Sequence, residues 1–278
     1  MSFINVWKLE KARDRFVYRC YGLFGRKPIN VYWWSSRKNF GDLMTPALLL
    51  KYGYAPVYRK KHHADLLCVG SILDGVSDNF CGKVLGAGLI KDQELRLPNA
   101  SILAVRGKLT RERLGLGKSV PLGDPGLLAD KLVVGSVSKE YSFGLVPHYM
   151  DKHNPVVSGL VKAYGDEICL IDAESYPKEV ISSIAKCEFI LSSSLHGIIA
   201  AHSLGIPAIW VRLSDSVVGN GFKFRDYASS VEIELDPVEI DVDVSLSDIR
   251  AQAVLPGLDI IKHRKSELDR MFASLADG

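Results

Sequence analysis

Two histidines lie six residues apart in the segment SSSLHGIIAAHSLGIPAIW, which covers Ser192–Trp210. A histidine side chain exchanges a proton near neutral pH, so either one could act as a general acid or base. His202 falls on the apolar stripe of a predicted helix, which is typical of a packed and hydrogen-bonded core histidine. His196 lies off that stripe in the first helical turn. We therefore expect His196 to be the residue that carries out chemistry.

The elements around His196 predict a ligand site. The apolar run at residues 187–193 predicts a buried strand, Gly205 is expected just past the end of the helix, and residues 207–211 predict a second parallel strand. In open α/β sheets, ligands bind at the carboxyl ends of the strands, and a helix N-terminus favours an anion there. Gly197 has no side chain, and we expect it to let a ligand approach closely.

The rest of the chain alternates strand and helix patterns in the same way, which predicts an α/β fold. We expect two Rossmann-like doubly wound domains, residues 1–135 on the acceptor side and residues 136–278, that face one another across a cleft holding the site. Thr45 and Pro46 predict the N-cap and first residue of one helix. A last helix, at about residues 246–276, is expected to pack back on the first domain.

Composition indicates a soluble globular protein. The chain has 278 residues, of which 47% are hydrophobic and 24% charged, and this length suits two domains of about 130 residues each. The net charge of +3 is too small to indicate nucleic-acid binding. The five cysteines show no CxxC spacing, so neither a disulfide framework nor a zinc site is predicted. A cytoplasmic protein without a secretory signal fits these features.

The N-terminal stretch WKLEKARDRFVYRCYGLFGRKP, residues 7–28, mixes lysine and arginine with aromatic residues. Such a segment can rest on an anionic membrane surface, which would place the protein at the inner face of the membrane. The alternative is a helix that packs on the first domain with a solvated basic face.

Three pieces of the chain together resemble the polysaccharide pyruvyltransferase family. They are NFGDLMTPALL at residues 39–49, the VRG to LGDPGLL segment at residues 105–128, and SSSLHGIIAAHSLGIPAI followed by FKFRDY within residues 192–227. The resemblance implies a bacterial transferase of exopolysaccharide biosynthesis with an architecture like that of the GT-B glycosyltransferases. Such an enzyme transfers a pyruvyl group from phosphoenolpyruvate to two hydroxyls of a sugar in an exopolysaccharide, capsule or lipopolysaccharide precursor, forming a cyclic ketal.

The matching motifs also imply roles for residues. His196 would be the general acid or base, and Arg106 would bind the phosphate or carboxylate of phosphoenolpyruvate. Ser193 and Ser194 would hold the anion together with the helix N-terminus. Many family members carry an arginine where this chain has Ser194.

A basic residue elsewhere can compensate for the arginine missing at position 194. The FKFRDY segment supplies Lys223 and Arg225, and we expect one of them to contact the anion.

Further site residues are predicted at the ends of other strands. His148 ends a predicted strand at the cleft, where it is either catalytic or structural. Asn39, Gly41 and Asp42 are expected at the ligand edge of the first sheet, and Asp42 either binds acceptor hydroxyls or caps the following helix.

No metal and no cofactor are expected, because the implied transfer from phosphoenolpyruvate does not intrinsically require a metal. His62 and His63 do not predict a metal site, because adjacent histidines point in opposite directions on a strand and have no third ligand. The expected partners are phosphoenolpyruvate and a sugar acceptor, which can be lipid-linked. Two alternatives stay open: a GT-B-type glycosyltransferase that uses a nucleotide sugar, and an inactive glycan-binding homologue.

Overall fold

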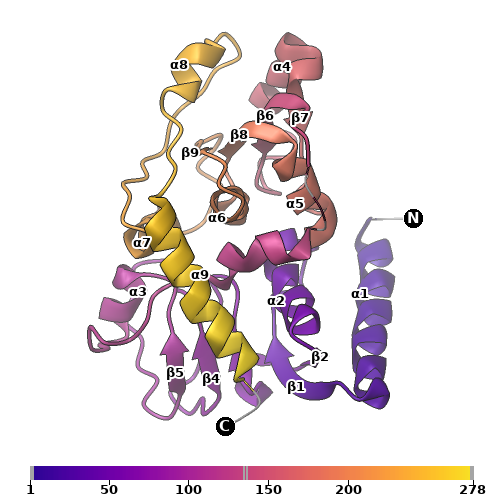
Figure 1. Ribbon diagram of the computed structural model, residues 1–278, viewed down its shortest axis with the longest axis vertical. Helices are drawn as coiled ribbons and strands as arrows, with labels where there is room; N and C mark the ends of the chain where they lie inside the picture. Colours follow the sequence, from indigo (N-terminus) through magenta and orange to yellow (C-terminus); the bar gives the residue numbers. More distant parts are fainter. Residues whose placement is uncertain (1–2, 134, 136, 276–278) are drawn as a thin grey trace.

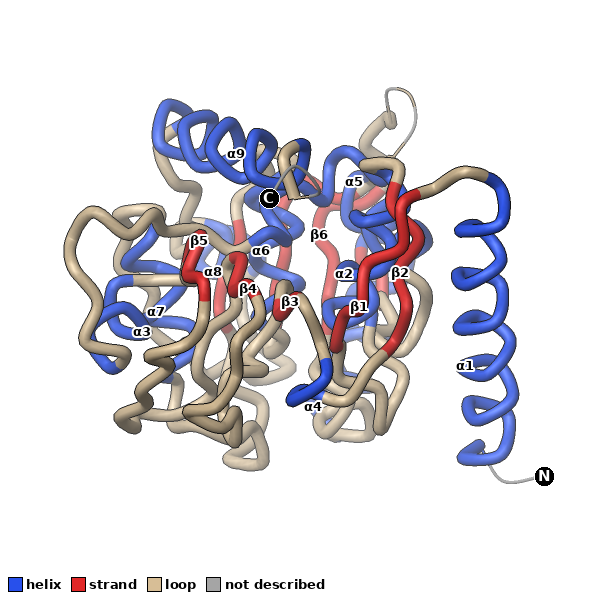
Figure 2. Tube along the Cα trace, turned by 90° about the horizontal axis from the view of Figure 1, so that it is seen from below, coloured by secondary structure: helices blue, strands red, loops and turns tan. Residues whose placement is uncertain are grey.

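The chain forms two parallel β-sheets with helices on their faces (Figures 1 and 2). The computed structural model describes residues 3–133, 135 and 137–275. The first sheet has the strand order β2-β1-β3-β4-β5 and the second has the order β7-β6-β8-β9. The strands are β1 (Lys27–Tyr32), β2 (Tyr54–Tyr58), β3 (Leu66–Leu67), β4 (Lys83–Leu85), β5 (Ser101–Ala104), β6 (Tyr141–Val146), β7 (Ile168–Leu170), β8 (Cys187–Ser192) and β9 (Ala208–Trp210).

Helices connect most of these strands, which confirms the predicted α/β class. The α-helices are α1 (Phe3–Cys20), α2 (Phe40–Lys51), α3 (Lys108–Arg113), α4 (Pro155–Tyr164), α5 (Pro177–Ala185), α6 (Leu195–Ser203), α7 (Phe222–Ser230), α8 (Leu246–Arg250) and α9 (Leu258–Ala273). Short 3₁₀-helices are η1 (Tyr21–Phe24), η2 (Lys61–His63), η3 (Pro125–Leu132) and η4 (Gly165–Glu167). None of the helices in the described ranges is long and apolar enough to cross a membrane.

The order of the strands creates one switch point in each sheet. β1 pairs with both β2 and β3, and β6 pairs with both β7 and β8. The chain therefore leaves β1 toward one side and returns on the other, and it does the same around β6. Ligands of such sheets bind beyond the carboxyl ends of the strands at these points.

One buried cluster contains hydrophobic side chains from helices that are connected to both sheets. It includes Phe40 and Met44 of α2, Leu127 of η3, and Ile198 and Ile199 of α6. The predicted domain boundary between residues 135 and 136 lies beside positions 134 and 136, which are outside the described residues.

Helix α2 begins earlier than predicted. Asn39 is its N-cap, and the side-chain Oδ1 accepts a hydrogen bond of 2.9 Å from the Gly41 amide. Pro46 therefore lies inside the helix, where it removes one backbone N–H donor. Thr45 does not cap the helix, because its hydroxyl accepts from the Val69 amide at 3.2 Å. The Thr-Pro pair was a wrong signal because asparagine offers the better cap.

One prediction for the C-terminal region is also corrected. The helix expected at 246–276 divides into α8 and α9, and Pro256 lies between them because proline cannot continue a helix. The FKFRDY segment forms most of α7. Helix α9 contacts the first sheet's helical layer, with Phe272 stacked on Tyr52 at 4.8 Å.

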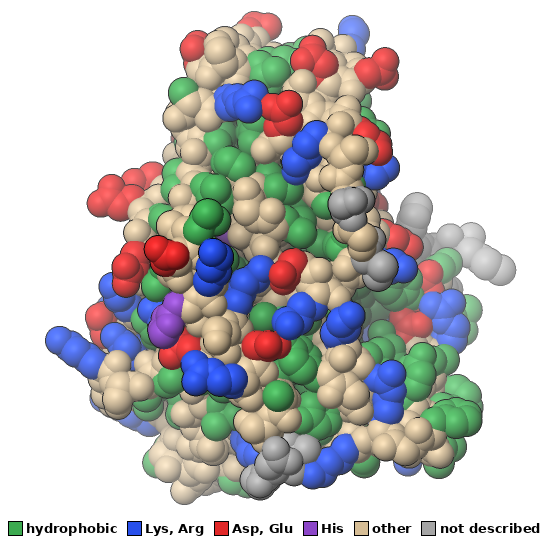
Figure 3. Space-filling view, viewed as in Figure 1, with side chains coloured by type: hydrophobic (Ala, Val, Ile, Leu, Met, Phe, Trp, Pro, Cys, Tyr) green, Lys and Arg blue, Asp and Glu red, His purple; other side chains and the backbone are tan. Residues whose placement is uncertain are grey.

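Helix α1 lies along the edge of the first sheet beside β2 (Figures 1 and 2). Its inward side makes both polar and aromatic contacts. Trp7 and Lys11 donate to the Ser35 carbonyl at 3.2 and 2.9 Å, and Arg15 donates to the Ser35 hydroxyl at 2.8 Å. Tyr18 packs edge-on against Trp33. The outward side carries Phe16, which is 70% exposed. Figure 3 shows hydrophobic side chains gathered at the lower right, over the end of this helix.

His202 is a core histidine, as predicted. It is 1% exposed, and its Nδ1 and Nε2 lie 2.9 Å from the Tyr227 hydroxyl and 3.0 Å from the Val254 carbonyl. Because a carbonyl only accepts, Nε2 carries the proton and the tyrosine hydroxyl donates to Nδ1. Burial lowers the pKa of His202 to about 4.

The burial of His202 predicts that the protein becomes less stable in mild acid. Its pKa falls from 6.5 in the unfolded chain to about 4 in the fold, so the folded state binds fewer protons within this window. The free energy of unfolding then decreases as pH falls, by about 1.5 kcal/mol for this group between about pH 6.5 and 5. Urea unfolding of the wild type and His202→Gln measures it. Equal slopes against pH in both proteins would contradict the assignment.

Candidate functional site

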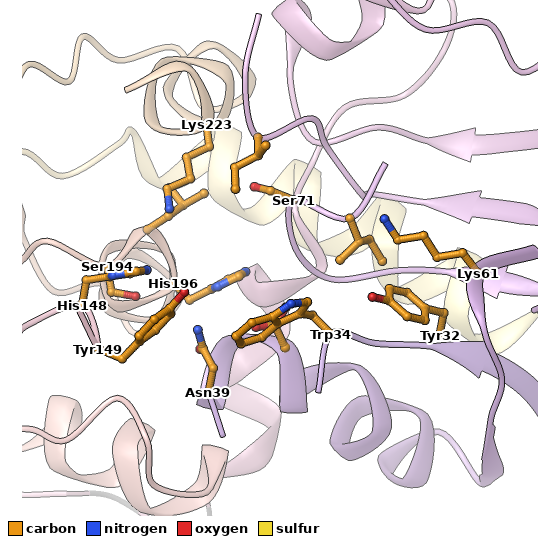
Figure 4. Close-up of a pocket in the computed structure, with 14 residues that line it drawn as sticks. Tyr32, Trp34, Asn39, Lys61, Ser71, His148, Tyr149, Ser194, His196 and Lys223 are labelled. Carbon is orange, nitrogen blue, oxygen red and sulfur yellow. The ribbon is translucent and has the colours of Figure 1, made fainter. Parts of the chain in front are cut away.

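A pocket of about 200 Å³ opens where the carboxyl ends of the two sheets meet (Figure 4). Residues that follow strands of the first sheet line one side: Tyr32, Trp34, Asn39, Asp42, Lys61, Ser71, Ile72 and Ile90. Residues of the second half line the other: His148, Tyr149, Ser194, Leu195, His196 and Lys223. The loops after β1, β3, β6 and β8 all contribute, so the pocket joins the switch points of both sheets.

His196 lies at the centre of this pocket, in the first turn of α6. The residue is 8% exposed, and its Nε2 has no hydrogen-bond partner among the described residues. Burial, followed by the positive charges of Lys223 and Arg106, lowers the pKa of His196 to about 3. The imidazole is therefore neutral at physiological pH. A buried polar atom without a partner is costly, so this nitrogen is available to a ligand.

Gly41 makes room for this imidazole, and Gly70 makes room for the neighbouring Asp42 carboxyl group. A Cβ added at Gly41 would lie 2.0 Å from Nδ1 of His196, so the ring packs directly on the backbone of the first turn of α2. A Cβ at Gly70 would lie 3.1 Å from Oδ1 of Asp42 and 3.9 Å from Cε1 of His196. Gly70 also has a φ of +108°, which favours glycine. The carboxyl and imidazole groups thus approach the same small space.

Asp42 is the buried acid of the pocket. It lies in the first turn of α2 and is 8% exposed. Burial raises its pKa to about 7, although the positive charge of Lys223 opposes the rise. The carboxyl group therefore retains a proton for much of the time near neutral pH, which is the range required of a general acid.

Lys223 reaches the pocket from α7. Its side chain extends toward Ser194 and His148 in Figure 4. It is 8% exposed, and its Nζ makes no hydrogen bond or ion pair with any described residue. Burial and the charge of Arg106 lower its pKa to about 8. Arg225 is placed differently: it lines a neighbouring pocket and donates to the Asn220 carbonyl at 3.0 Å.

Arg106 does not line the pocket, in contrast to the predicted direct contact with an anion. Its side chain is fully buried, and Nε donates to Oδ2 of Asp226 at 2.9 Å. The other nitrogens donate to the Ser71 hydroxyl at 2.6 Å and to the Leu89 carbonyl. Asp226 also accepts from the amide and hydroxyl of Thr110. Arg106 therefore ties the Ser71 loop to α7, the helix that carries Lys223.

His148 lies across the pocket from the first sheet. Its Nδ1 accepts a hydrogen bond of 3.3 Å from the Met150 amide, and its ring contacts Tyr149 at 4.2 Å. Burial lowers its pKa to about 3, with Lys223 and Arg37 adding to the effect. This histidine, like His196, is neutral at physiological pH.

The serines of the SSS segment have separate roles. Ser193 does not face the pocket: its hydroxyl accepts from the His148 amide at 2.8 Å and donates to Asp151 at 2.6 Å, so it holds the His148 loop. Ser194 is the N-cap residue of α6 and lines the pocket.

Gly197 serves packing rather than ligand access. A Cβ there would lie 2.3 Å from the Ser192 hydroxyl and 3.1 Å from Cβ of Val146, on the sheet side of α6. Asn39 does line the pocket, and because its Oδ1 caps α2, its amide nitrogen is available to face a ligand.

Several lining residues were missed by the sequence analysis. Trp34 and Tyr149 stack at 6.0 Å across the mouth, one from each half, and Tyr32, Lys61 and Ser71 line the first-sheet side. The aromatic run after β1 was a signal, since it extends beyond the strand into the ligand edge of the sheet. No group of three or more potential metal ligands occurs within the described part of the chain.

Comparisons with known proteins agree with the motifs. A family model described as "Polysaccharide pyruvyl transferase" matches residues 12–215. The chain is 31% identical over 269 residues to "Uncharacterized protein L143" of Acanthamoeba polyphaga mimivirus, covering 87% of this chain and 90% of that protein. It is 29% identical over 236 residues to "Succinoglycan biosynthesis protein ExoV" of Rhizobium meliloti (strain 1021), covering 81% and 70%.

Among solved structures, a match is AviGT4, a glycosyltransferase involved in avilamycin A biosynthesis. The identity is 12%, the TM-score is 0.37, and the match covers 91% of this chain and 98% of that one.

A side chain at position 41 is predicted to displace the His196 imidazole. In Gly41→Ala, the added Cβ would overlap the ring, so we expect a shifted His196 resonance in NMR spectra and about 1–3 kcal/mol of lost stability. Gly117→Ala is the control, because a Cβ there meets only the Ser119 hydroxyl at 3.7 Å. An unchanged His196 signal in Gly41→Ala would show that the ring does not occupy this space.

Proposed function

Because the chain belongs to the polysaccharide pyruvyl transferase family, we propose that it transfers a pyruvyl group from phosphoenolpyruvate to a sugar. The acceptor is a precursor of an exopolysaccharide, capsule or lipopolysaccharide, and the product is a cyclic ketal. The observation that carries the proposal is a pair of groups in the pocket without partners among the described residues, Nε2 of His196 and Nζ of Lys223. The relative that takes part in succinoglycan biosynthesis supports a glycan acceptor.

The reaction needs one proton donor and one proton acceptor. A proton adds to the methylene carbon of phosphoenolpyruvate, which leaves a cation-like centre on the carbon that bears the phosphate oxygen. The first sugar hydroxyl attacks this carbon and loses its proton. The carbon–oxygen bond to phosphate breaks, inorganic phosphate leaves, and the second hydroxyl closes the ketal as its proton departs. One hydroxyl proton replaces the proton given to the methylene carbon and the other leaves on the phosphate, so protons and bonds balance without an oxidant or reductant.

The donor's anionic groups have matching partners in the pocket. Lys223 supplies a positive charge, and the backbone amides of Leu195 and His196 point out of the first turn of α6, where they have no helical carbonyl to bind. The volume of about 200 Å³ suits a small anion and lies below the about 300–1,000 Å³ of pockets for drug-sized ligands. A nucleotide sugar is therefore the less fitting donor.

The two titratable groups take opposite roles. Asp42, whose pKa is raised to about 7, donates the proton to the methylene carbon. His196 is neutral and has a free Nε2, so it accepts the proton of the attacking hydroxyl. His148 lies on the same side as Lys223 and is the second base within reach of the pocket.

Arg106 acts as a positioning residue. By joining Ser71 to Asp226, it fixes α7 against the first sheet and so sets the direction of Lys223. Lys223 takes the place of the family arginine that is missing at Ser194, because both residues line the same pocket.

The acceptor sugar enters from the aromatic mouth of the pocket. Trp34 and Tyr149 offer flat apolar surfaces that suit the faces of a sugar ring, and Asn39 offers an amide for its hydroxyls. The acceptor is lipid-linked in this proposal, and the protein works in the cytoplasm at the inner face of the membrane.

Replacement of Lys223 tests the donor site. Lys223→Ala should weaken phosphoenolpyruvate binding about 10- to 100-fold, because a buried charged hydrogen bond is lost. Arg225→Ala is the matched control, since its side chain lines the neighbouring pocket and should leave the Kd nearly unchanged. Calorimetric titration measures both, with a UDP-sugar as a further ligand. Binding of the UDP-sugar in place of phosphoenolpyruvate would refute the proposal and indicate a glycosyltransferase.

The pH dependence of turnover tests the acid. Asp42 must be protonated to donate, so kcat/KM should fall as pH rises above about 7. Asp42→Asn should lose this limb and about 10²- to 10⁴-fold in rate, whereas the exposed Asp166→Asn should retain both. Phosphate release from phosphoenolpyruvate with glycan precursors provides the assay. A wild-type profile in Asp42→Asn would remove the carboxyl group from the mechanism.

A further inference from the structure

Helix α1 and η1 present an apolar stripe to the outside of the molecule. Leu9 is 74% exposed and Phe16 is 70% exposed, and Leu23 and Phe24 of η1 reach 84% and 82%. Val17, at 41%, lies beside Phe16. Leu9 and Phe16 are seven residues apart and so lie along one line of the α1 surface, and Leu23 and Phe24 follow in η1. Figure 3 shows this end of the molecule as a gathering of hydrophobic side chains.

The stripe is not the face by which α1 packs on the protein, because Trp7 and Tyr18 pack inward against the hydrophobic core. Trp7, Lys11 and Arg15 hydrogen-bond to Ser35 of the protein body. A surface helix normally buries its apolar face and exposes its polar face. Here a second apolar row stays exposed in addition to the inward aromatic residues, which indicates a surface that another apolar phase covers.

The charged residues around the stripe indicate which apolar phase covers it. Residues 6–27 contain seven lysine or arginine residues against two acids. Both acids have partners: Glu10 pairs with Lys38 at 3.0 Å, and Asp14 pairs with Arg13 at 2.8 Å. Lys8 and Arg19 are exposed on the helix. A positive fringe around apolar side chains matches an anionic lipid headgroup layer above acyl chains.

We propose that α1 and η1 dock the protein on an anionic phospholipid bilayer, with Leu9, Phe16, Leu23 and Phe24 inserted among the acyl chains. A second copy of the chain fits less well, because a two-fold contact through this stripe would bring the same positive fringe against itself. Docking deepens the proposed function by naming the surface that meets a lipid-linked acceptor, but it does not depend on the chemistry of the pocket.

Flotation of the full-length protein with vesicles tests the docking. The vesicles contain phosphatidylcholine alone or equal parts of phosphatidylcholine and phosphatidylglycerol. We expect binding to the anionic vesicles that weakens with added salt. Phe16→Ser combined with Leu23→Ser and Phe24→Ser should lower the partition coefficient at least about tenfold. The control is Leu258→Ser, which alters a residue 60% exposed at the start of α9.

A second pair of variants separates charge from insertion. Lys8→Gln with Arg19→Gln should reduce binding to anionic vesicles, whereas Lys91→Gln with Lys118→Gln, exposed elsewhere, should not. Thermal unfolding verifies that all variants are folded. Failure of the wild type to float with anionic vesicles would overturn the proposal, as would equal flotation of the triple variant. A dimer in light scattering that the triple variant abolishes would also overturn it.

Activity distinguishes this proposal from the proposed function. The triple variant should turn over phosphoenolpyruvate with a lipid-free acceptor as the wild type does, because α1 contributes no residue to the catalytic pocket. Vesicle binding without any turnover would leave the docking standing and refute the transferase.

Discussion

The imidazole of His196 occupies space that exists only because residue 41 has no side chain. This contact fixes α6 of the second half against α2 of the first, at the place where the carboxyl ends of two parallel sheets meet. His196 lines the pocket, and its buried Nε2 has no hydrogen-bond partner among the described residues. Most proteins satisfy a buried imidazole, as this chain does at His202. A buried nitrogen without a hydrogen bond costs free energy, which is typical of a site that binds a ligand.

Burial also sets the protonation states of His196 and of the titratable groups around it. Burial lowers the pKa values of His196 and Lys223 and raises that of Asp42. Near neutral pH, His196 is therefore neutral, Asp42 is partly protonated and Lys223 stays mostly charged. Binding of a small polyanion would raise the pKa values of the basic groups, because its negative charge favours their protonated forms. The buried Arg106–Asp226 ion pair lies outside the lining of the pocket. It orients α7, the helix that carries Lys223.

Local pattern was enough to predict part of this site. A strand that ends in small polar residues before a helix placed His196 in the first turn of α6, and Gly205 lies just past the helix end with φ of +70°. The space provided by Gly41 could not be predicted, because it depends on contact with a residue 155 positions away. The choice between Lys223 and Arg225 depends equally on tertiary contacts, since the Arg106–Asp226 pair orients the helix that carries both. Pro46 misled the assignment of α2 because Asn39 provides a cap one turn and a half earlier.

The central claim is that this pocket holds phosphoenolpyruvate against Lys223, and proton uptake on binding tests it most directly. The titration is done by calorimetry at about pH 8 in buffers of different ionisation enthalpy. The pKa of free Lys223 is about 8, so anion binding should complete its protonation and take up about half a proton per ligand. Lys223→Met should abolish that uptake. Binding without proton uptake in the wild type, or no binding of phosphoenolpyruvate at all, would contradict the account.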